Sequence, residues 1–324
     1  MCPKGSYQHI STIMTDNNII KTLRTEMLNT VERNILPFWL NNMQDEEHGG
    51  FYGQMRGDGT LIKDADKGGI LNGRILWSFA AAYRVLQRPE YLAAAKRARD
   101  YIINHFIDSE YGGSYWSVDY LGNAKDTKKQ FYAIGFMLYG MSEYVRAAIT
   151  DLRIPQTEIE ETIEISFQLF DTIEVHSLDR INNGYIEAQT REWGEIADMR
   201  LSDLDANYPK SQNTHLHIME PYTNLLRCLN EMETKGMSVD QNRKQQVADA
   251  LRNIICIFTD RILNPDTHHL DLFFENDWTR GAGWLESYGH DIECSWLMHE
   301  AAMVLADKDI LKKVEPIVVL VAKA

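Results

Sequence analysis

The amino-acid sequence predicts an all-α fold, an α/α barrel of alternating inner and outer helices. Apolar side chains recur with helical spacing over most of the 324 residues. Helices that are apolar on all sides, which must be enclosed, alternate with amphipathic helices that can face water. A glycine-rich break returns between the helix pairs at Gly50, Gly113 and Gly184. Because paired helices repeat in this way, we expect two concentric rings, with the apolar helices enclosed in the inner ring and the amphipathic helices facing water in the outer ring.

Hydrophobic spacing places each helix in turn. A first amphipathic helix is expected over Ile19–Leu40, where one stripe is apolar. The inner, nearly apolar helices are expected over Ile70–Leu86, Phe131–Val145, Thr214–Leu229 and Asp291–Leu305. The outer, amphipathic helices are expected over Tyr91–Phe106, Glu158–Val175, Gln241–Ile262 and Ile310–Val321. The joining loops leave room for short strands, but no strands alternate regularly with the helices, so a parallel α/β sheet is not predicted.

The predicted ring lacks helices at its C-terminal end. About nine helices can be placed, and a ring cannot close with an odd element left over. We therefore expect a barrel that is incomplete at its C-terminus, with residues 16–324 as one catalytic domain lacking its last helices. Residues 1–15 are expected to form a flexible N-terminal extension.

Composition excludes several classes of function. The chain carries 33 Lys and Arg against 47 Asp and Glu, a net charge of −14 that repels phosphate backbones and anionic lipid. Nucleic-acid and membrane partners are therefore not expected, and no apolar run approaches the ~20 residues of a membrane span. The N-terminus has no secretory signal and the 4 cysteines are scattered, which indicates a reducing cytoplasm. The oligomeric state is not predicted.

Polar side chains in the inner helices gather near their N-terminal ends. They are Arg74, Tyr132, His217 and His290. The long loops enter the ring at these ends, so we expect the side chains to converge on one mouth of the barrel, where ligand sites form. An arginine in an apolar helix needs an acceptor, either a protein carboxylate or a substrate oxygen. Tyr132 is equally suited to the core and to a site.

The start of the last inner helix carries a candidate acid/base group. His290, Glu293 and Trp296 are three residues apart and share one helical face. A histidine oriented by a carboxylate beside an aromatic ring suits proton transfer on a sugar. The alternative is a helix cap formed by the same two residues. We favour the acid/base role, because so apolar a helix does not tolerate polar groups without partners.

The third inner helix opens with a second histidine. Asn213 and His217 are four residues apart and align, whereas His215 points elsewhere. His215 and His217 would bind a metal together only in an extended segment, and no further ligands have a recognisable spacing, so no metal is predicted. The sequence also lacks glycine-rich phosphate loops and other nucleotide motifs, so no cofactor is predicted.

Three segments carry a family resemblance that spans residue 16 to the end of the chain. Lys67–Trp77, Asn213–Glu220 and Gly289–Leu297 resemble the cellobiose 2-epimerases of the N-acylglucosamine 2-epimerase superfamily. The resemblance implies an (α/α)6 barrel. It also implies cofactor-free epimerisation, at C2, of the reducing-end glucose in β-1,4-linked disaccharides, with a disaccharide as the only partner.

The same resemblance assigns roles to residues of this sequence. Arg74 would bind the O1/O2 region of the sugar and stabilise an enediolate. His217 would assist ring opening or polarise the carbonyl, while Asn213 and Asp205 would hold hydroxyls or that histidine.

On the last inner helix, the resemblance implies that His290 is one general acid/base and that Glu293 positions it. Tyr132 and Trp296 would shape the sugar pocket. The family places its second acid/base histidine in its last three helices, which this chain does not contain. Because inversion at C2 needs reprotonation on the opposite face, this departure bears directly on the mechanism.

Other functions remain open at this point. A mannose isomerase or an N-acylglucosamine 2-epimerase would share the fold and differ in its loops. An α/α-barrel glycosidase needs two carboxylates roughly 6.5–9.5 Å apart, and the predicted mouth is richer in histidine than in paired acids. An inactive sugar-binding fragment is the last alternative, because the predicted ring is incomplete.

Overall fold

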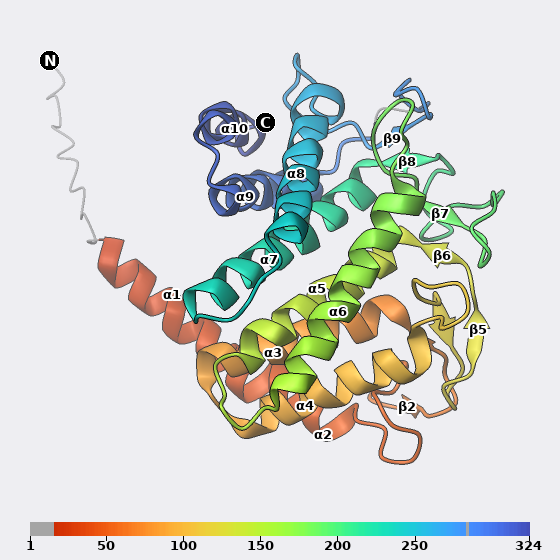
Figure 1. Ribbon diagram of the computed structural model, residues 1–324, viewed down its shortest axis with the longest axis vertical. Coiled ribbons are helices and arrows are strands. Elements are labelled where there is room, and N and C mark those ends of the chain that lie inside the picture. Colours follow the sequence, from red (N-terminus) through yellow and green to blue (C-terminus); the bar gives the residue numbers. More distant parts are fainter. Residues whose placement is uncertain (1–15, 283–284) are drawn as a thin grey trace, which may run out of the picture. The chain divides into compact units, whose positions relative to one another are not determined.

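The computed structural model describes residues 16–282 and 285–324, which belong to two compact units, Met1–Gln44 and Asp45–Ala324. In the first unit, α1 (Asp16–Thr30), a π-helical turn (Val31–Ile35) and α2 (Leu36–Asn42) follow without a break (Figure 1). This continuous helix includes the predicted range Ile19–Leu40. The predicted N-terminal extension, residues 1–15, lies outside the described residues.

The second unit consists of paired helices, as the sequence predicts. Its inner helices are α3 (Gly69–Leu86), α5 (Phe131–Ala148), α7 (Gln212–Thr234) and α9 (Tyr288–Leu305). Its outer helices are α4 (Pro89–Tyr101), α6 (Gln156–Thr172), α8 (Gln241–Ile257) and α10 (Lys308–Val321). Each outer helix packs against the inner helix that precedes it in the chain. The prediction of an all-α fold with alternating inner and outer helices is confirmed.

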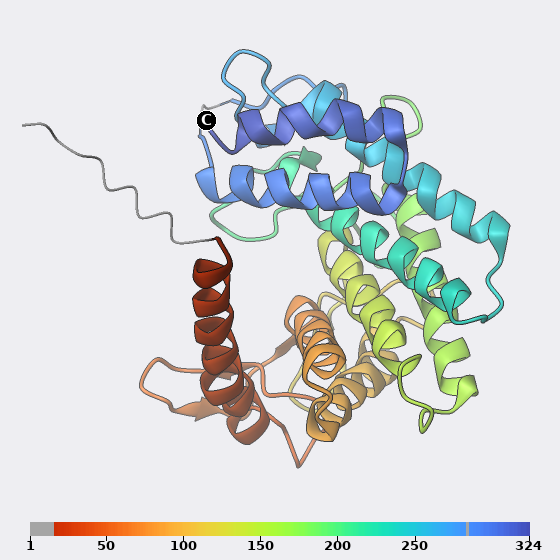
Figure 2. The same cartoon turned by 90° about the vertical axis from the view of Figure 1, so that its left-hand side faces the viewer.

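The inner helices stand side by side in chain order (Figure 2). α5 packs against α3 and α7, and α7 packs against α5 and α9. In the part of the chain that the structure describes, α3 and α9 each pack closely against one inner neighbour only. The inner helices of this unit therefore form an arc. Every helix that the structure describes is too short or too polar to span a lipid bilayer.

Short antiparallel strands lie in the loops, as expected. β1 (Gln54–Met55) pairs with β2 (Leu61–Ile62), and β4 (Ser117–Val118) pairs with both β3 (Lys67–Gly68) and β5 (Ala124–Asp126). β6 (Lys129–Gln130) pairs with β7 (Ala188–Gln189), and β8 (Lys210–Ser211) pairs with β9 (Phe273–Phe274). Because β3, β6 and β8 run directly into inner helices, these pairings attach each helix start to the loop of the next repeat.

Glycines let the inner helices approach each other closely at one level. A Cβ atom on Gly73 would lie 2.7 Å from the carbonyl oxygen of Phe136, and one on Gly135 would lie 2.6 Å from that of His217. Pro221, four residues after His217, has no N–H to donate to this carbonyl. The helices α3, α5 and α7 are therefore in close contact where Arg74, Phe136 and His217 lie.

The outer helices end differently from the prediction. The final turns of the predicted outer helices are π-helical at Ile102–Phe106, Ile173–Ser177 and Phe258–Ile262. An isolated antiparallel bridge follows each of them directly, such as Ile107 with Ser114. The apolar spacing continues through the π turn, so the sequence pattern alone does not separate it from the α-helix.

A buried lysine–aspartate pair fastens each of the first three loops, and we call this contact the lysine clasp. The pairs are Lys67–Asp45, Lys129–Asp108 and Lys210–Asp179, with 2.8 Å between nitrogen and oxygen in each. The three lysine side chains are fully buried. Each ammonium also donates to a backbone carbonyl: those of Lys67 and Lys129 donate to Gly49 and Gly112 in the same loop, and that of Lys210 donates to Asn276 in the next loop. Each lysine stands two residues before the first residue of an inner helix.

Candidate functional site

A large cavity runs along the inner helices of the second unit. Its volume is about 820 Å³, and α3, α5, α7 and α9 all contribute to its lining. The predicted site residues on this lining are Arg74, His217, Glu293 and Trp296. The structure thus brings together side chains that are more than 200 positions apart in the sequence.

Arg74 is held by aromatic side chains. Its Nη2 donates a hydrogen bond of 3.1 Å to the hydroxyl of Tyr132, and its guanidinium lies 4.4 Å from the centre of the Phe136 ring. No carboxylate lies within ion-pair distance of Arg74 among the described residues. The guanidinium therefore keeps donors for an oxygen-rich ligand.

Tyr132 complements this arginine. Burial raises the pKa of Tyr132 to about 12, so its hydroxyl stays protonated at neutral pH. The hydroxyl oxygen accepts from Arg74, and its proton is free to be donated to a ligand oxygen. The Tyr132 ring also meets His217 edge-on, with 4.8 Å between ring centres.

His217 is oriented by a residue that the sequence analysis missed. Its Nδ1 lies 3.0 Å from Oε2 of Glu220, one helical turn further along α7. The expected partners lie elsewhere: the Asp205 carboxylate accepts from the backbone and hydroxyl of Ser202, and Oδ1 of Asn213 is buried without a partner among the described residues. The i, i+3 spacing of His217 and Glu220 was the available signal.

His290 lies at the start of α9 and lines a smaller cavity of about 140 Å³ together with Asn213 and Asp205. Its backbone N–H donates to the Ser287 hydroxyl, which caps the helix. Its Nδ1 is buried and has no partner among the described residues. Burial lowers the pKa of His290, the nearby Glu293 carboxylate opposes this, and His217 adds to it. The imidazole is therefore biased toward its neutral, basic form.

Glu293 differs from the prediction. Within the described residues no hydrogen bond joins it to His290, on which it acts through its charge. It lines the large cavity beside Trp296, whose side chain is 54% exposed and so available for stacking. The helix-cap alternative also fails for Glu293, because Ser287 is the cap.

The smaller cavity has a second acidic residue that the sequence did not indicate. Glu187 is buried, and its Oε2 accepts a hydrogen bond of 2.6 Å from the Thr214 hydroxyl. Its Oε1, and both polar side-chain atoms of Gln212, are without partners among the described residues. Burial raises the pKa of Glu187 to about 7. A glutamate in a loop gives no sequence signal for such burial.

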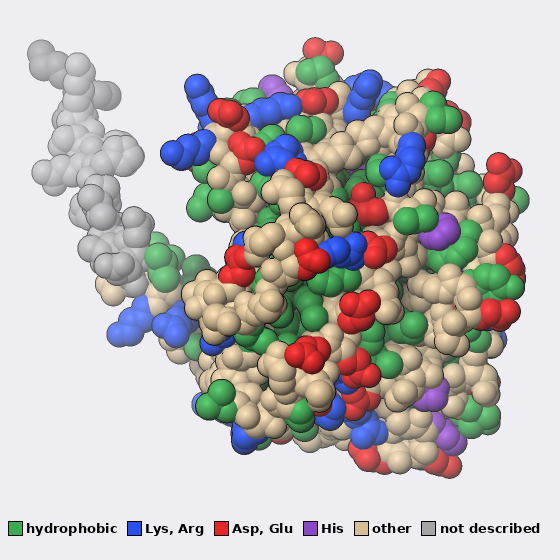
Figure 3. Space-filling model, in the orientation of Figure 1, with side chains coloured by type: hydrophobic (Ala, Val, Ile, Leu, Met, Phe, Trp, Pro, Cys, Tyr) green, Lys and Arg blue, Asp and Glu red, His purple; other side chains and the backbone are tan. Residues whose placement is uncertain are grey.

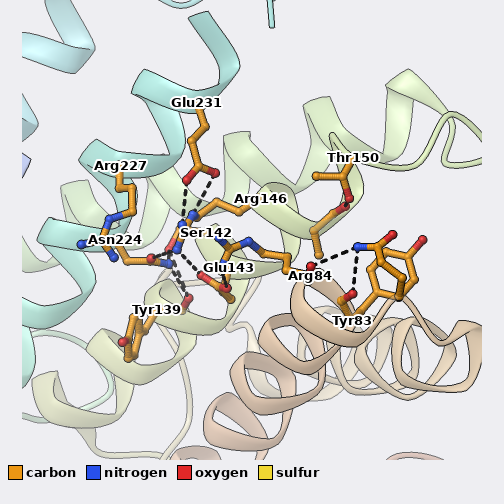
Figure 4. A network of polar contacts seen from close by, with 12 residues as sticks. Tyr83, Arg84, Tyr139, Ser142, Glu143, Arg146, Thr150, Asn224, Arg227 and Glu231 are labelled. Carbon is orange, nitrogen blue, oxygen red and sulfur yellow. Dashed lines mark hydrogen bonds and ion pairs between the residues drawn. The ribbon is translucent and has the colours of Figure 1, made fainter. Parts of the chain in front are cut away.

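A network of charged groups lies along the lining of the large cavity (Figure 4). Arg146 donates to Glu143, Asn224 and Glu231 at distances of 2.7 to 3.0 Å. Arg84 donates to the other oxygen of Glu143 at 2.7 Å. These contacts join α3, α5 and α7 and pair opposite charges, so the network has a structural role in the cavity wall.

His215 has a structural role. Its Nδ1 lies 2.6 Å from the Ser211 carbonyl oxygen, and its Nε2 accepts from the Tyr185 backbone N–H at 2.9 Å. Burial lowers the pKa of His215 to about 4, so the ring is neutral. A metal shared by His215 and His217 does not fit, because neither nitrogen of His215 is free. The described residues contain no group of three or more potential metal ligands.

Comparison with known proteins identifies the family. Residues 50–320 match the N-acylglucosamine 2-epimerase (GlcNAc 2-epimerase) family. The chain belongs to this family. This confirms the resemblance found in the sequence. The match covers α3 to α9 and all of α10 except its last residue, and with them every predicted site residue from Arg74 to Trp296.

Relatives within the N-acylglucosamine 2-epimerase family are similar over most of the chain. The cellobiose 2-epimerase of Bacteroides fragilis is 51% identical over 302 residues, 93% of this chain and 71% of the relative. That of Ruminococcus albus is 38% identical over 295 residues, 91% and 68% of the two chains. The solved cellobiose 2-epimerase of Bacillus thermoamylovorans B4167 has a TM-score of 0.82 at 36% identity, and the match covers 94% and 71% of the two chains.

The charged side chains on the face shown in Figure 3 are consistent with the net charge of −14. Acidic side chains are distributed over this face and are interspersed with lysine and arginine. Such a surface suits a neutral substrate better than a polyanion.

Proposed function

We propose that this protein epimerises C2 of the reducing-end glucose of a β-1,4-linked disaccharide such as cellobiose, converting it to glucosyl-mannose. Family membership and two relatives named cellobiose 2-epimerase, at 51% and 38% identity, support this activity. The observation that carries the proposal is Arg74, whose guanidinium has no carboxylate partner among the described residues and faces a cavity shared with His217. This combination suits the enediolate that forms from C1 and C2 of the open-chain sugar, because the guanidinium can balance the negative charge that develops on O1.

The reaction begins with opening of the sugar ring. The C2 proton becomes acidic only when C1 is an aldehyde, so a group must move the proton from the O1 hydroxyl to the ring oxygen. His217 suits this role, because Glu220 fixes its Nδ1 and leaves Nε2 for the sugar. Arg74 then binds O1 and O2, and the Tyr132 hydroxyl donates to one of them as negative charge develops.

Proton transfer at C2 follows. His290, biased toward its neutral form, takes the C2 proton and leaves an enediolate. Return of a proton to the same face restores glucose, whereas its delivery to the opposite face gives mannose. Epimerisation therefore needs either a second proton-transfer group or rotation of the intermediate about its bonds. Every step moves a proton, so the reaction needs no cofactor.

The remaining predicted residues bind the substrate. Asn213 and Asp205 offer an amide and a carboxylate to hydroxyl groups from the smaller cavity, and the exposed ring of Trp296 offers a stacking surface for a sugar. Glu293 faces the same cavity as Trp296. We place the reaction in the cytoplasm, in keeping with free thiols at the described cysteines Cys228, Cys256 and Cys294.

Deuterium exchange tests this function. Cellobiose is incubated with the protein in heavy water, and NMR follows deuterium at C2 together with the appearance of the mannose epimer. We expect both signals from the wild-type protein. A ketose product would instead indicate an isomerase, and an unchanged substrate would contradict the proposal.

A substitution at His290 tests the assigned base. His290→Gln should lower the exchange rate at C2 by about 10²–10⁴-fold, the usual effect of losing a positioned general base. His299→Gln is the matched control, because it changes another histidine on the same helix. Exchange at the wild-type rate in His290→Gln would remove His290 from the mechanism.

A further inference from the structure

The loop before α9 lacks the lysine clasp of the first three loops. Two residues before α9 begins, where the other inner helices have lysine, the chain has Glu286. Two residues after the last π turn, where Asp108 and Asp179 stand in their repeats, it has Asn264. Asn264 keeps the turn, since its Oδ1 accepts from the backbone N–H of Asp266 at 3.0 Å. The ion pair itself is absent from this loop in the described residues.

A histidine takes the place of the missing lysine. Nδ1 of His269 lies 2.8 Å from Oδ2 of Asp291, which belongs to the first turn of α9. Oδ1 of the same buried carboxylate accepts from the Leu270 backbone N–H at 3.0 Å. On the other side of the ring, Nε2 of His269 lies 3.8 Å from Glu286, and the Tyr288 ring packs edge-on at 5.6 Å. Two adjacent residues of the loop are thus tied to one helical carboxylate.

The loop segment tied in this way is also attached to α7. The Gln212 backbone N–H, at the start of α7, donates to the Leu272 carbonyl oxygen at 2.8 Å. Ser211 pairs with Phe273 in the β8–β9 ladder, one residue further on. Residues 269–274 therefore join the first turn of α7 to the first turn of α9. These turns carry Asn213 and His290, and His217 lies in the next turn of α7.

We propose that His269 and Asp291 form a histidine clasp that fixes His290 relative to His217. His269 and Asp291 are then positioning residues for proton transfer at the sugar. The catalytic part of this inference rests on the proposed function. Its geometric part rests on the contacts of residues 269–274. Because Asp291 adjoins His290 in the same helical turn, release of its carboxylate frees the turn that holds the base.

The test variants follow from the hydrogen bond between His269 and Asp291. The Asp291 carboxylate accepts this hydrogen bond, so Nδ1 of His269 carries the proton and donates it. An asparagine side chain places an N–H near the position of Nδ1, whereas a glutamine side chain places one near Nε2. His269→Asn should therefore keep the clasp and His269→Gln should lose it. His268→Asn is the control, since His268 is the adjacent histidine, has a positive φ of 64° that asparagine tolerates, and has no side-chain bond among the described residues.

The experiment measures geometry and catalysis separately. Amide hydrogen exchange over residues 288–294 reports the attachment of α9, and steady-state kinetics with cellobiose report kcat and KM. In His269→Gln and Asp291→Ala we expect amide exchange at least tenfold faster. We also expect kcat about 10–100-fold lower with KM within threefold, because small displacements of a catalytic group have effects of this size. His269→Asn and His268→Asn should stay within threefold of the wild type in all three quantities.

Each outcome decides the inference. Unchanged amide exchange in His269→Gln would overturn the clasp itself. Faster amide exchange with unchanged kcat would overturn the positioning role and leave a structural contact. If the wild-type protein shows no deuterium exchange at C2, the proposed function fails, and amide exchange still decides whether the clasp holds α9.

Discussion

At the scale of single residues, three histidines show how partners decide a role. His215 has both ring nitrogens bound to backbone groups, His217 has one bound to Glu220, and His290 has a buried nitrogen with no partner among the described residues. Spacing in the sequence separated His215 from His217 correctly. It did not find Glu220, because a glutamate on a helix usually faces water.

The pH dependence of His215 follows from its burial. Its pKa is about 4 in the folded protein against 6.5 for the free side chain, so the unfolded chain binds the extra proton between these values. This residue therefore lowers stability as the pH falls from 6.5 to 4, by on the order of 3 kcal/mol in total, and has no such effect above 6.5. NMR titration of the wild-type protein checks this: the ring signals of His215 should stay constant from pH 8 down to about pH 5. A midpoint near 6.5 would contradict the assignment.

At the scale of secondary-structure elements, the sequence predicted the helices well and the contacts between them poorly. Apolar spacing located α3, α5, α7 and α9 because a buried helix has apolar residues along its whole length. Apolar spacing did not predict the π turns, since a π turn and an α turn bury the same kind of side chain. It did not predict the lysine clasps either, because lysine is almost never fully buried and Lys129 has no distinguishing neighbours in the sequence.

Gly135 connects helix packing to the site. In Gly135→Ala the added Cβ would lie 2.6 Å from the carbonyl oxygen of His217, a backbone atom that moves only with α7. We expect a loss of about 1–3 kcal/mol in the free energy of unfolding, with reduced activity because His217 shifts. Urea denaturation measures the stability. Gly68→Ala is the control, because a Cβ there meets nothing within 4 Å. Equal stability of the two variants would contradict the close contact.

At the scale of the whole molecule, the lysine clasps recur with different support. Asp108 accepts a hydrogen bond of 2.8 Å from Lys129. It also accepts two from Arg191, at 2.8 and 3.0 Å. The Asp45 carboxylate has Lys67 as its only side-chain cation within the described residues, besides backbone N–H donors. The lysine clasps therefore share one geometry, but the clasp at Asp108 should tolerate the loss of its lysine better than the clasp at Asp45.

This difference gives a comparison between two variants. Lys67→Met leaves a buried carboxylate without a cation and should lower the free energy of unfolding by about 3–5 kcal/mol. Lys129→Met should cost clearly less, because Arg191 still neutralises Asp108. Urea denaturation of the two variants measures both values. The reverse order would show that Arg191 does not compensate for the lysine.

The π turns have a consequence for the length of the outer helices. A π turn contains one residue more than the α turn that it replaces, so each outer helix that ends in one carries an extra residue just before its loop. Because a π turn and an α turn each complete about one rotation, loss of that residue would restore a regular helix and leave the following chain in the same direction. Asp108, two residues beyond its π turn, would still face Lys129. A one-residue deletion there should therefore keep the ion pair, whereas a deletion inside a regular α-helix would rotate the following chain by about 100°.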